Sequence, residues 1–320
     1  MKAYLGIDVG SVSTNIVIVS ETGEILTSLY LRTKGRPIEV IQEGLKTAAS
    51  SAPAGLFIAG AGTTGSGRHL AGVMIGADIV KNEITAHAVA ASMLFPDIQT
   101  ILEIGGQDSK IIILRNGIVT DFAMNTVCAA GTGSFLDQQA NRLNIPITRF
   151  GELALQSEKP VRIAGRCTVF AESDMVHKQQ MGYRIPDIIN GLCEALVRNY
   201  LNNVGKGKEI LPPIVFQGGV AANSGIRAAF ERALNLPVVV PGYFNVMGAI
   251  GAAQLAKETV AGSKNTRFKG FKVTALPFRS GSFECDGCPN VCEVVEIYEG
   301  DRVIGRWGSR CGKWDLEDAL

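Results

Sequence analysis

The chain has 320 residues, 46% of them hydrophobic, and a mean hydropathy of +0.19. This length and apolar content are sufficient for two domains that each bury a core of their own. The 31 basic and 30 acidic residues leave a net charge of +1, which excludes a polyelectrolyte that binds nucleic acid or acidic membranes through charge alone.

The first residues lead directly into a predicted strand that ends in an acid, Asp8, so we expect no signal peptide. The sequence also contains no run of about 18 apolar residues that could span a bilayer. We therefore expect a cytoplasmic protein. Seven cysteines, an odd number without an export signal, favour metal or redox chemistry over a disulfide framework.

Two segments that begin 95 residues apart, residues 7–19 and residues 102–114, are near copies of each other. Each predicts a buried strand, a tight polar turn and a second strand. Glu103 occupies the position that Asp8 has in the first copy. Glycine turns let backbone N–H groups approach phosphate, and an acid beside such a turn can hold the water shell of Mg²⁺. We expect two lobes with a nucleotide between them, although two unrelated buried hairpins would give the same pattern.

A third glycine turn follows a predicted buried strand at residues 212–217. The pair Gly218 and Gly219 leaves room for a base or ribose against the backbone, and a helical stretch begins at residue 224. This order of turns resembles the superfamily of sugar kinases, heat-shock chaperones and actin, which implies an α/β, ribonuclease H-like, two-lobed ATPase fold.

We expect three segments in this chain. Lobe I covers residues 1–97, and lobe II covers residues 98–262, with a final linking helix at residues 245–257 that returns to lobe I. A small β-rich, metal-binding tail covers residues 263–320.

Two cysteines lie in the body of the chain. Cys128 stands at or just before a predicted helix N-terminus, and Cys167 follows Arg166 and precedes another helical run. Free amides at a helix N-terminus stabilise a thiolate or an anionic cluster. Two thiolates cannot complete the four-cysteine ligation of a [4Fe-4S] cluster, but two chains related by a twofold axis can. Two ordinary buried cysteines are the alternative.

Six motifs together strongly resemble the 2-hydroxyacyl-CoA dehydratase activators, also called the BadF/BadG/BcrA/BcrD ATPases. They lie at residues 6–11, 82–87, 104–110, 125–133, 165–170 and 216–220. The resemblance covers roughly residues 1 to 260. It implies a homodimer with one [4Fe-4S] cluster held by Cys128 and Cys167 of each subunit. It also implies that ATP hydrolysis drives one low-potential electron into a partner iron–sulfur dehydratase or reductase, with ferredoxin or flavodoxin as donor.

The resemblance and the duplicated turns assign roles to individual residues. The expected catalytic residues are Asp8, which organises Mg²⁺, and Glu103 and Gln107, which orient or deprotonate the attacking water. The expected contacts to ATP or ADP are Gly10, Ser11, Ser13, Thr14, Gly105, Gly106, Gln217, Gly218, Gly219 and Asn223.

The tail departs from the short members of this family. After a strand-like stretch at residues 271–278 come four further cysteines: Cys285, Cys288, Cys292 and, after another β-like stretch, Cys311. Such spacing is a strong metal signature, and both Zn²⁺ and a second [4Fe-4S] cluster accept four thiolates. An unmetallated or disulfide-paired tail remains the alternative.

Two other functions share part of this pattern. A small-molecule kinase of the same superfamily would have the two-lobed ATP site but no need for Cys128 and Cys167 at a dimer interface. A nucleotide-responsive redox or metal sensor would explain the cysteines but would leave the duplicated phosphate turns without a purpose.

Overall fold

The computed structural model describes residues 1–159, 161–262 and 265–316. The chain forms two compact units. Unit 1 combines Met1–Ala90 with Gly248–Leu320, and unit 2 is Ala91–Met247. The chain passes between the units inside two helices, α3 (Glu83–Leu94) and α9 (Met247–Thr259). The tail that we expected as a third segment clusters with unit 1.

Unit 1 contains a five-stranded sheet in the order β3-β2-β1-β4-β5. Its strands are β1 (Lys2–Val9), β2 (Ser13–Ser20), β3 (Ile25–Arg32), β4 (Phe57–Thr64) and β5 (Ile79–Val80). The first three pair antiparallel, whereas β4 runs parallel to both β1 and β5. Two further helices, α1 (Pro37–Ser51) and α2 (Arg68–Ile75), complete this part of the unit.

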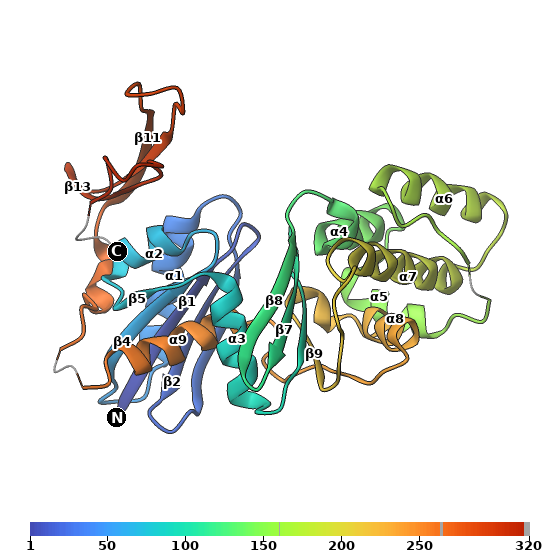
Figure 1. The fold of residues 1–320 in the computed structure, drawn as a ribbon, viewed down its shortest axis with the longest axis horizontal. Helices are drawn as coiled ribbons and strands as arrows, with labels where there is room; N and C mark the ends of the chain where they lie inside the picture. The colour runs from blue at the N-terminus through green and yellow to red at the C-terminus, as the bar shows by residue number, and fades with distance from the viewer. Residues whose placement is uncertain (160, 263–264, 317–320) are drawn as a thin grey trace. The chain divides into compact units, whose positions relative to one another are not determined.

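Side chains of β1 alternate between two buried faces, as the period of a strand requires. Leu5 and Ile7 join the core that includes Ile41 of α1 and Met74 of α2. Gly6 lies on the other face, where α9 crosses the sheet (Figure 1). Because both faces are covered, β1 reads as a nearly continuous apolar run.

Unit 2 repeats this topology with a sheet in the order β10-β9-β6-β7-β8. Its strands are β6 (Thr100–Ile104), β7 (Ser109–Arg115), β8 (Ile118–Asn125), β9 (Ile214–Gln217) and β10 (Val238–Val239). Again three strands pair antiparallel and two continue in parallel. The duplication seen in the two turns therefore extends to the whole sheet.

Helices gather on one side of the unit 2 sheet (Figure 1). They are α4 (Gly133–Arg142), α5 (Phe150–Leu155), α6 (Thr168–Gln180), α7 (Ile185–Asn203) and α8 (Ser224–Leu234). The long helix α7 has most of its residues buried. Its Tyr200 meets Phe230 of α8 edge to face at 5.2 Å, a favoured aromatic geometry.

The tail forms a three-stranded antiparallel sheet of β11 (Phe278–Glu284), β12 (Glu293–Glu299) and β13 (Arg302–Trp307). It packs on α2, where a Cβ atom on Gly305 would lie 2.6 Å from Val73 and where Trp307 stacks at 5.8 Å on His69. Burial is the main reason that the pKa of His69 is lowered.

The strand expected at residues 271–278 is wrong, because Phe271–Ala275 forms a 3₁₀ turn, η4. Gln42 of α1 donates through Nε2 to the carbonyl oxygens of Val273 and Leu276 at 3.1 and 2.9 Å. These side-chain bonds satisfy carbonyls that a strand would have offered to a neighbour. In the part of the chain that the structure describes, no helix is long and apolar enough to cross a membrane.

The crossing of α9 with the sheet and with α3 depends on glycines. A Cβ atom on Gly251 would lie 1.8 Å from the carbonyl oxygen of Ala86, and one on Gly6 equally close to that of Ala249. Both distances are far inside van der Waals contact, and both obstacles are backbone, so neither can be relieved by a rotamer change.

We expect Gly251→Ala to lower the free energy of unfolding by about 2 kcal/mol or more, because the added methyl forces two helix backbones apart. Urea titration followed by circular dichroism measures this change. Gly242→Ala is the matched control, since nothing lies within 4 Å of the added atom there. Equal unfolding midpoints for the two variants would contradict the account of the crossing.

Candidate nucleotide site and cysteine pair

The turn between β1 and β2 is closed by a hydrogen bond from Gly10 N to Ser13 O of 2.8 Å. Asp8, at the end of β1, lies partly buried beside two glycines. A Cβ atom on Gly65 would be 2.5 Å from its Oδ1, and one on Gly248 would be 2.4 Å from its Oδ2. Both positions must remain glycine so that the carboxylate keeps its place beside the turn.

Residues of this turn differ in what they offer a ligand. Ser11 is exposed and Ser13 is partly buried. Thr14 is fully buried, and its hydroxyl lies 3.0 Å from that of Thr33, which in turn donates to Gly10 O at 3.0 Å. Through this contact Thr14 supports the Thr33 hydroxyl that bonds the turn, so Thr14 helps to hold the turn from inside the protein.

The turn between β6 and β7 has the same closure, with Gly105 N donating to Asp108 O at 3.0 Å. Gly105 and Gly106 are partly buried. Gln107, which follows them and precedes Asp108, is exposed. An exposed amide at the tip of a glycine turn can reach a water or a phosphate oxygen.

Helix α4 is bonded directly to this second turn. Gly133 N donates to Gly105 O at 2.9 Å, and Ser134 donates to Gly106 O through its N at 2.8 Å and its Oγ at 2.6 Å. Since the turn's carbonyls face α4, a displacement of Gly105 and Gly106 together must be followed by the start of that helix or break these three hydrogen bonds.

A buried cation that the sequence reading missed lies beside the second turn. Lys110 is 2% exposed, and its Nζ is 3.1 Å from Glu103 Oε2 and 2.8 Å from Asp108 Oδ2. Lys110 pairs in register with Glu103, as Asn15 pairs with Asp8 in the first copy. A lysine inside an otherwise apolar strand, opposite an acid, was the available signal. The ion pair makes Glu103 a weaker acceptor for a water proton than an uncompensated carboxylate.

The third glycine turn uses Gly218, whose φ of +89° is open mainly to glycine. Its N–H donates to Phe244 O at 2.8 Å, and Gly219 begins the short 3₁₀ helix η3 (Gly219–Ala222). Asn223 is the N-cap of α8, because its Oδ1 accepts from Ile226 N at 3.1 Å. Gln217, at the end of β9, is fully buried.

Unit 1 contains a matching turn after β4 that the sequence reading also missed. Gly65 has a φ of +90°, and Gly67 N donates to Val9 O at 2.8 Å. A Cβ atom on Gly65 would lie 2.4 Å from Val9 O, and one on Gly218 would lie 2.4 Å from Ile104 O. The signal was the run of threonine and glycine directly after a buried strand.

Cys128 and Cys167 stand on adjacent loops of unit 2. Cys128 directly precedes the 3₁₀ helix η1 (Ala129–Gly131), and Cys167 is the N-cap residue of α6. The Cys128 Sγ lies 3.9 Å from the carbonyl oxygen of Arg166. Asn125 fixes the first loop, accepting from Cys128 N at 2.9 Å and donating to Cys128 O at 2.8 Å. Both thiols are partly exposed.

Large apolar side chains are exposed next to both cysteines. Val127 is 95% exposed, Val169 66% and Phe170 65%. Exposed apolar residues that occur singly need no explanation, but three within three positions of two cysteines are typical of a surface that another protein covers.

The tail cysteines also lie on two neighbouring loops. Cys285 is buried and its N–H donates to Cys292 O at 2.8 Å, while Cys288 and Cys311 are exposed. The nearby indole of Trp314 is the main cause of a lowered pKa of the Cys285 thiol. Within the described ranges, no three His, Cys, Asp or Glu side chains converge closely enough to hold a metal ion.

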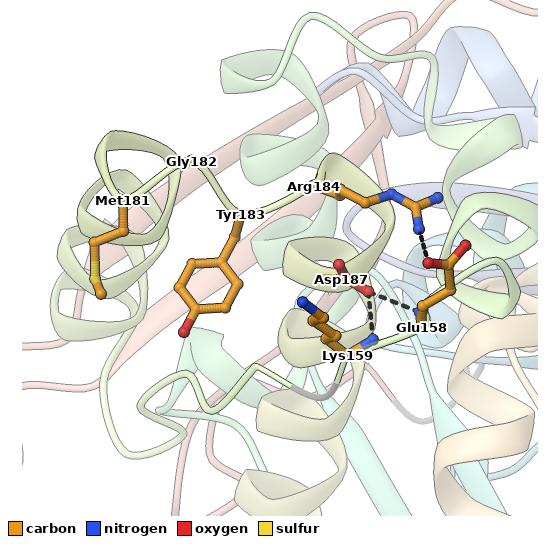
Figure 2. A pocket seen from close by; sticks show the side chains of 7 residues that line it. All are labelled: Glu158, Lys159, Met181, Gly182, Tyr183, Arg184 and Asp187. Carbon is orange, nitrogen blue, oxygen red and sulfur yellow. Dashed lines mark hydrogen bonds and ion pairs between the residues drawn. The ribbon is translucent and has the colours of Figure 1, made fainter.

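A separate hollow of about 410 Å³ lies in unit 2, beside the start of α7 (Figure 2). Two of its acids already have partners: Arg184 pairs with Glu158, and Asp187 accepts from Glu158 N and Lys159 N at 2.8 and 2.9 Å. The hydrogen bond from Lys159 N is the main reason that the pKa of Asp187 lies below its usual value, and the bond from Glu158 N adds to it. Met181, Gly182 and Tyr183 complete the lining.

A family model described as the BadF/BadG/BcrA/BcrD ATPase family matches residues 5–256. The (R)-2-hydroxyglutaryl-CoA dehydratase activating ATPase of Acidaminococcus fermentans is 37% identical over 270 residues, which cover 82% of this chain and 100% of the relative. The activator of lactoyl-CoA dehydratase of Anaerotignum propionicum is 34% identical over 79% of this chain and 97% of the relative.

A solved structure is similar as well. The activator of the 2-hydroxyisocaproyl-CoA dehydratase from Clostridium difficile, with bound ADPNP, superposes with a TM-score of 0.73 at 32% identity and covers 82% of this chain and 97% of that one. These matches confirm the family resemblance and the α/β two-sheet ATPase fold. The family match ends at residue 256, before the tail sheet begins.

We expect Lys110→Ala to lower the free energy of unfolding by about 3 to 5 kcal/mol, because it leaves the buried Glu103 carboxylate without its cation. Chemical denaturation at neutral pH measures the loss. Lys208→Ala is the control, since Lys208 pairs at 2.7 Å with Asp121, whose side chain is 51% exposed, and such a pair contributes about 1 kcal/mol or less. Similar losses in both variants would show that burial of the pair is not decisive.

Proposed function

Because this chain belongs to the BadF/BadG/BcrA/BcrD ATPase family and is an ATPase, we propose that it activates a 2-hydroxyacyl-CoA dehydratase or a related iron–sulfur reductase. In this proposal a homodimer couples ATP hydrolysis to the transfer of one low-potential electron, received from a ferredoxin or flavodoxin. The observation that carries the proposal is the pair of partly exposed thiols at two helix starts, in the same unit as a phosphate turn.

The cysteine pair fits half of a shared [4Fe-4S] site. Cys128 and Cys167 supply two thiolates, and the same pair from a second copy completes four. Free N–H groups at the two helix starts favour anionic sulfur. Val127, Val169 and Phe170 give the apolar surface that a second copy would cover. When bound, the cluster supplies a centre that takes up and releases a single electron.

Each unit has a glycine turn whose groups suit a nucleotide phosphate. Asp8 would order the water shell of Mg²⁺, and the backbone N–H groups around Gly10 in unit 1 and Gly105 in unit 2 would each receive phosphate oxygens. Gln107 is the residue best placed to orient the attacking water, since it is exposed at its turn. Glu103, paired with Lys110, contributes to the electrostatic environment of this turn.

Coupling follows from the hydrogen bonds between the second turn and α4. Cleavage of the γ-phosphate removes a contact from the turn at residues 105–107. The carbonyls of Gly105 and Gly106 are bonded to Gly133 and Ser134, so the turn and the start of α4 move together. The segment between Cys128 and α4 is only four residues long, so movement of the helix start displaces the thiol.

The tail is the second part of the proposal. Four thiols on two neighbouring loops are a ligand set for Zn²⁺ or a second [4Fe-4S] cluster. Binding requires these thiols to come closer together than they lie in the described part of the chain. Metal analysis of the wild type and of a variant that carries Cys285→Ala with Cys288→Ala tests this part, and equal metal contents would contradict it.

We expect Cys128→Ala or Cys167→Ala to remove the iron of the interface while ATP binding survives. The measurement is iron content after anaerobic reconstitution, made with Cys285→Ala and Cys288→Ala also present so that the tail contributes none. Cys193→Ala is the matched control, because Cys193 is fully buried in α7 and burial raises the pKa of its thiol to about 12. Retention of about four irons per dimer without Cys128 would defeat the proposal.

We expect Asp8→Asn to lower Mg²⁺-dependent ATP turnover by about tenfold or more, because the neutral amide holds the ion's water shell poorly. Gln107→Ala should lower kcat more than nucleotide affinity, since water positioning matters chiefly in the transition state. Steady-state phosphate release and nucleotide titration separate the two effects. Gln156→Ala, at another exposed glutamine of unit 2, is the control. Wild-type turnover in both site variants would rule out the assignment.

A further inference from the structure

Asn199 of α7 contacts both cysteine loops. Its side chain is buried, at 4% exposure, and its Nδ2 lies 2.6 Å from Gly165 O and 3.6 Å from Cys128 Sγ. A carbonyl oxygen can only accept, so the end of the amide that faces Gly165 must be the NH₂ group. The same NH₂ group therefore points a second hydrogen toward the sulfur of Cys128.

The surroundings hold this amide in one orientation. Asn203, one turn later on α7, donates through Nδ2 to Asn199 Oδ1 at 2.9 Å. A Cβ atom on Gly131 of the Cys128 loop would lie 2.7 Å from the same oxygen, so the loop packs directly on the amide. The neighbouring Arg198 donates to Ile163 O, which ties the loop that leads to Cys167 to α7 at a second point.

We propose that Asn199 is a positioning residue that clamps the two cysteine loops together and donates an N–H group to the sulfur of Cys128. The clamp is a property of the polypeptide alone. The donation to sulfur rests on the proposed function, because it matters for electron transfer only when Cys128 is a cluster ligand.

An N–H group that donates to sulfur shifts the reduction potential of a cluster in a known direction. Reduction adds negative charge to a cluster and its thiolates, and an N–H group aimed at sulfur stabilises that charge. Asn199 therefore raises the reduction potential of a cluster held by Cys128, and its removal lowers that potential. A residue that served only to pack α7 would leave the potential where it was.

The test compares Asn199→Ala with Asn202→Ala in the full-length protein. Asn202 lies on the same helix but is exposed, so it is a matched loss of an asparagine. Hydrogen–deuterium exchange of metal-free protein is measured over residues 126–131 and 163–167. We expect exchange in both segments to rise by about tenfold in Asn199→Ala, as for the loss of one buried hydrogen bond, and to stay unchanged in Asn202→Ala.

The second measurement is an anaerobic redox titration of reconstituted protein, followed by EPR. We expect the potential of Asn199→Ala to be more negative than that of the wild type. Asn199→Ser keeps a hydroxyl donor and should give an intermediate value, so it is the variant to titrate if the alanine variant loads iron poorly.

The outcomes separate the two parts of the inference from each other and from the proposed function. Wild-type exchange in Asn199→Ala would overturn the clamp. An unchanged potential in iron-loaded Asn199→Ala and Asn199→Ser would overturn the donation to sulfur. Wild-type protein that binds no iron through Cys128 would overturn the proposed function and the donation with it, while faster exchange in metal-free Asn199→Ala would still support the clamp.

Discussion

The close passage of two glycines over two strand ends is the constraint on which the rest of the structure depends. Gly65 and Gly218 adopt nearly the same φ, +90° and +89°. Each passes so close to the last carbonyl of the neighbouring strand that an added Cβ atom would lie 2.4 Å from its oxygen. Any side chain there would push β4 away from β1, or β9 away from β6. Each unit thereby brings an acid, a glycine turn and a second glycine turn to one edge of its sheet.

The two half-sites have the same backbone but different polar chemistry. In unit 1 the acid at the strand end is paired in register with Asn15, and in unit 2 with Lys110. The in-register partner is a neutral amide in the first copy, whereas in the second it is a lysine that forms an ion pair with Glu103. The two units thus share one scaffold, and a single position on the second strand gives their two acids different in-register partners. A small-molecule kinase with the same scaffold would not need the two cysteine loops that unit 2 adds.

Features that are local in sequence could be predicted, and those that depend on distant partners could not. The strands of the two duplicated hairpins with their turns, the strand Ile214–Gln217 and the helix Ser224–Leu234 follow from short apolar patterns and glycine positions. The 3₁₀ turn at Phe271–Ala275 was missed because its carbonyls are satisfied by Gln42, more than 200 residues earlier. Likewise, nothing near Cys128 in the sequence indicates that Asn199 reaches it.

The tail that docks on α2 also contains all the tryptophan of this chain. The chain has two tryptophans, Trp307 and Trp314, and both belong to the tail. Trp307 stacks on His69 of unit 1, and Trp314 meets Phe283 at 5.0 Å beside the Cys285 loop. Intrinsic tryptophan emission therefore reports on the tail alone, with one fluorophore at its contact with α2 and the other at its cysteine loops. Unit 2, which contains Cys128 and Cys167, is silent in that signal.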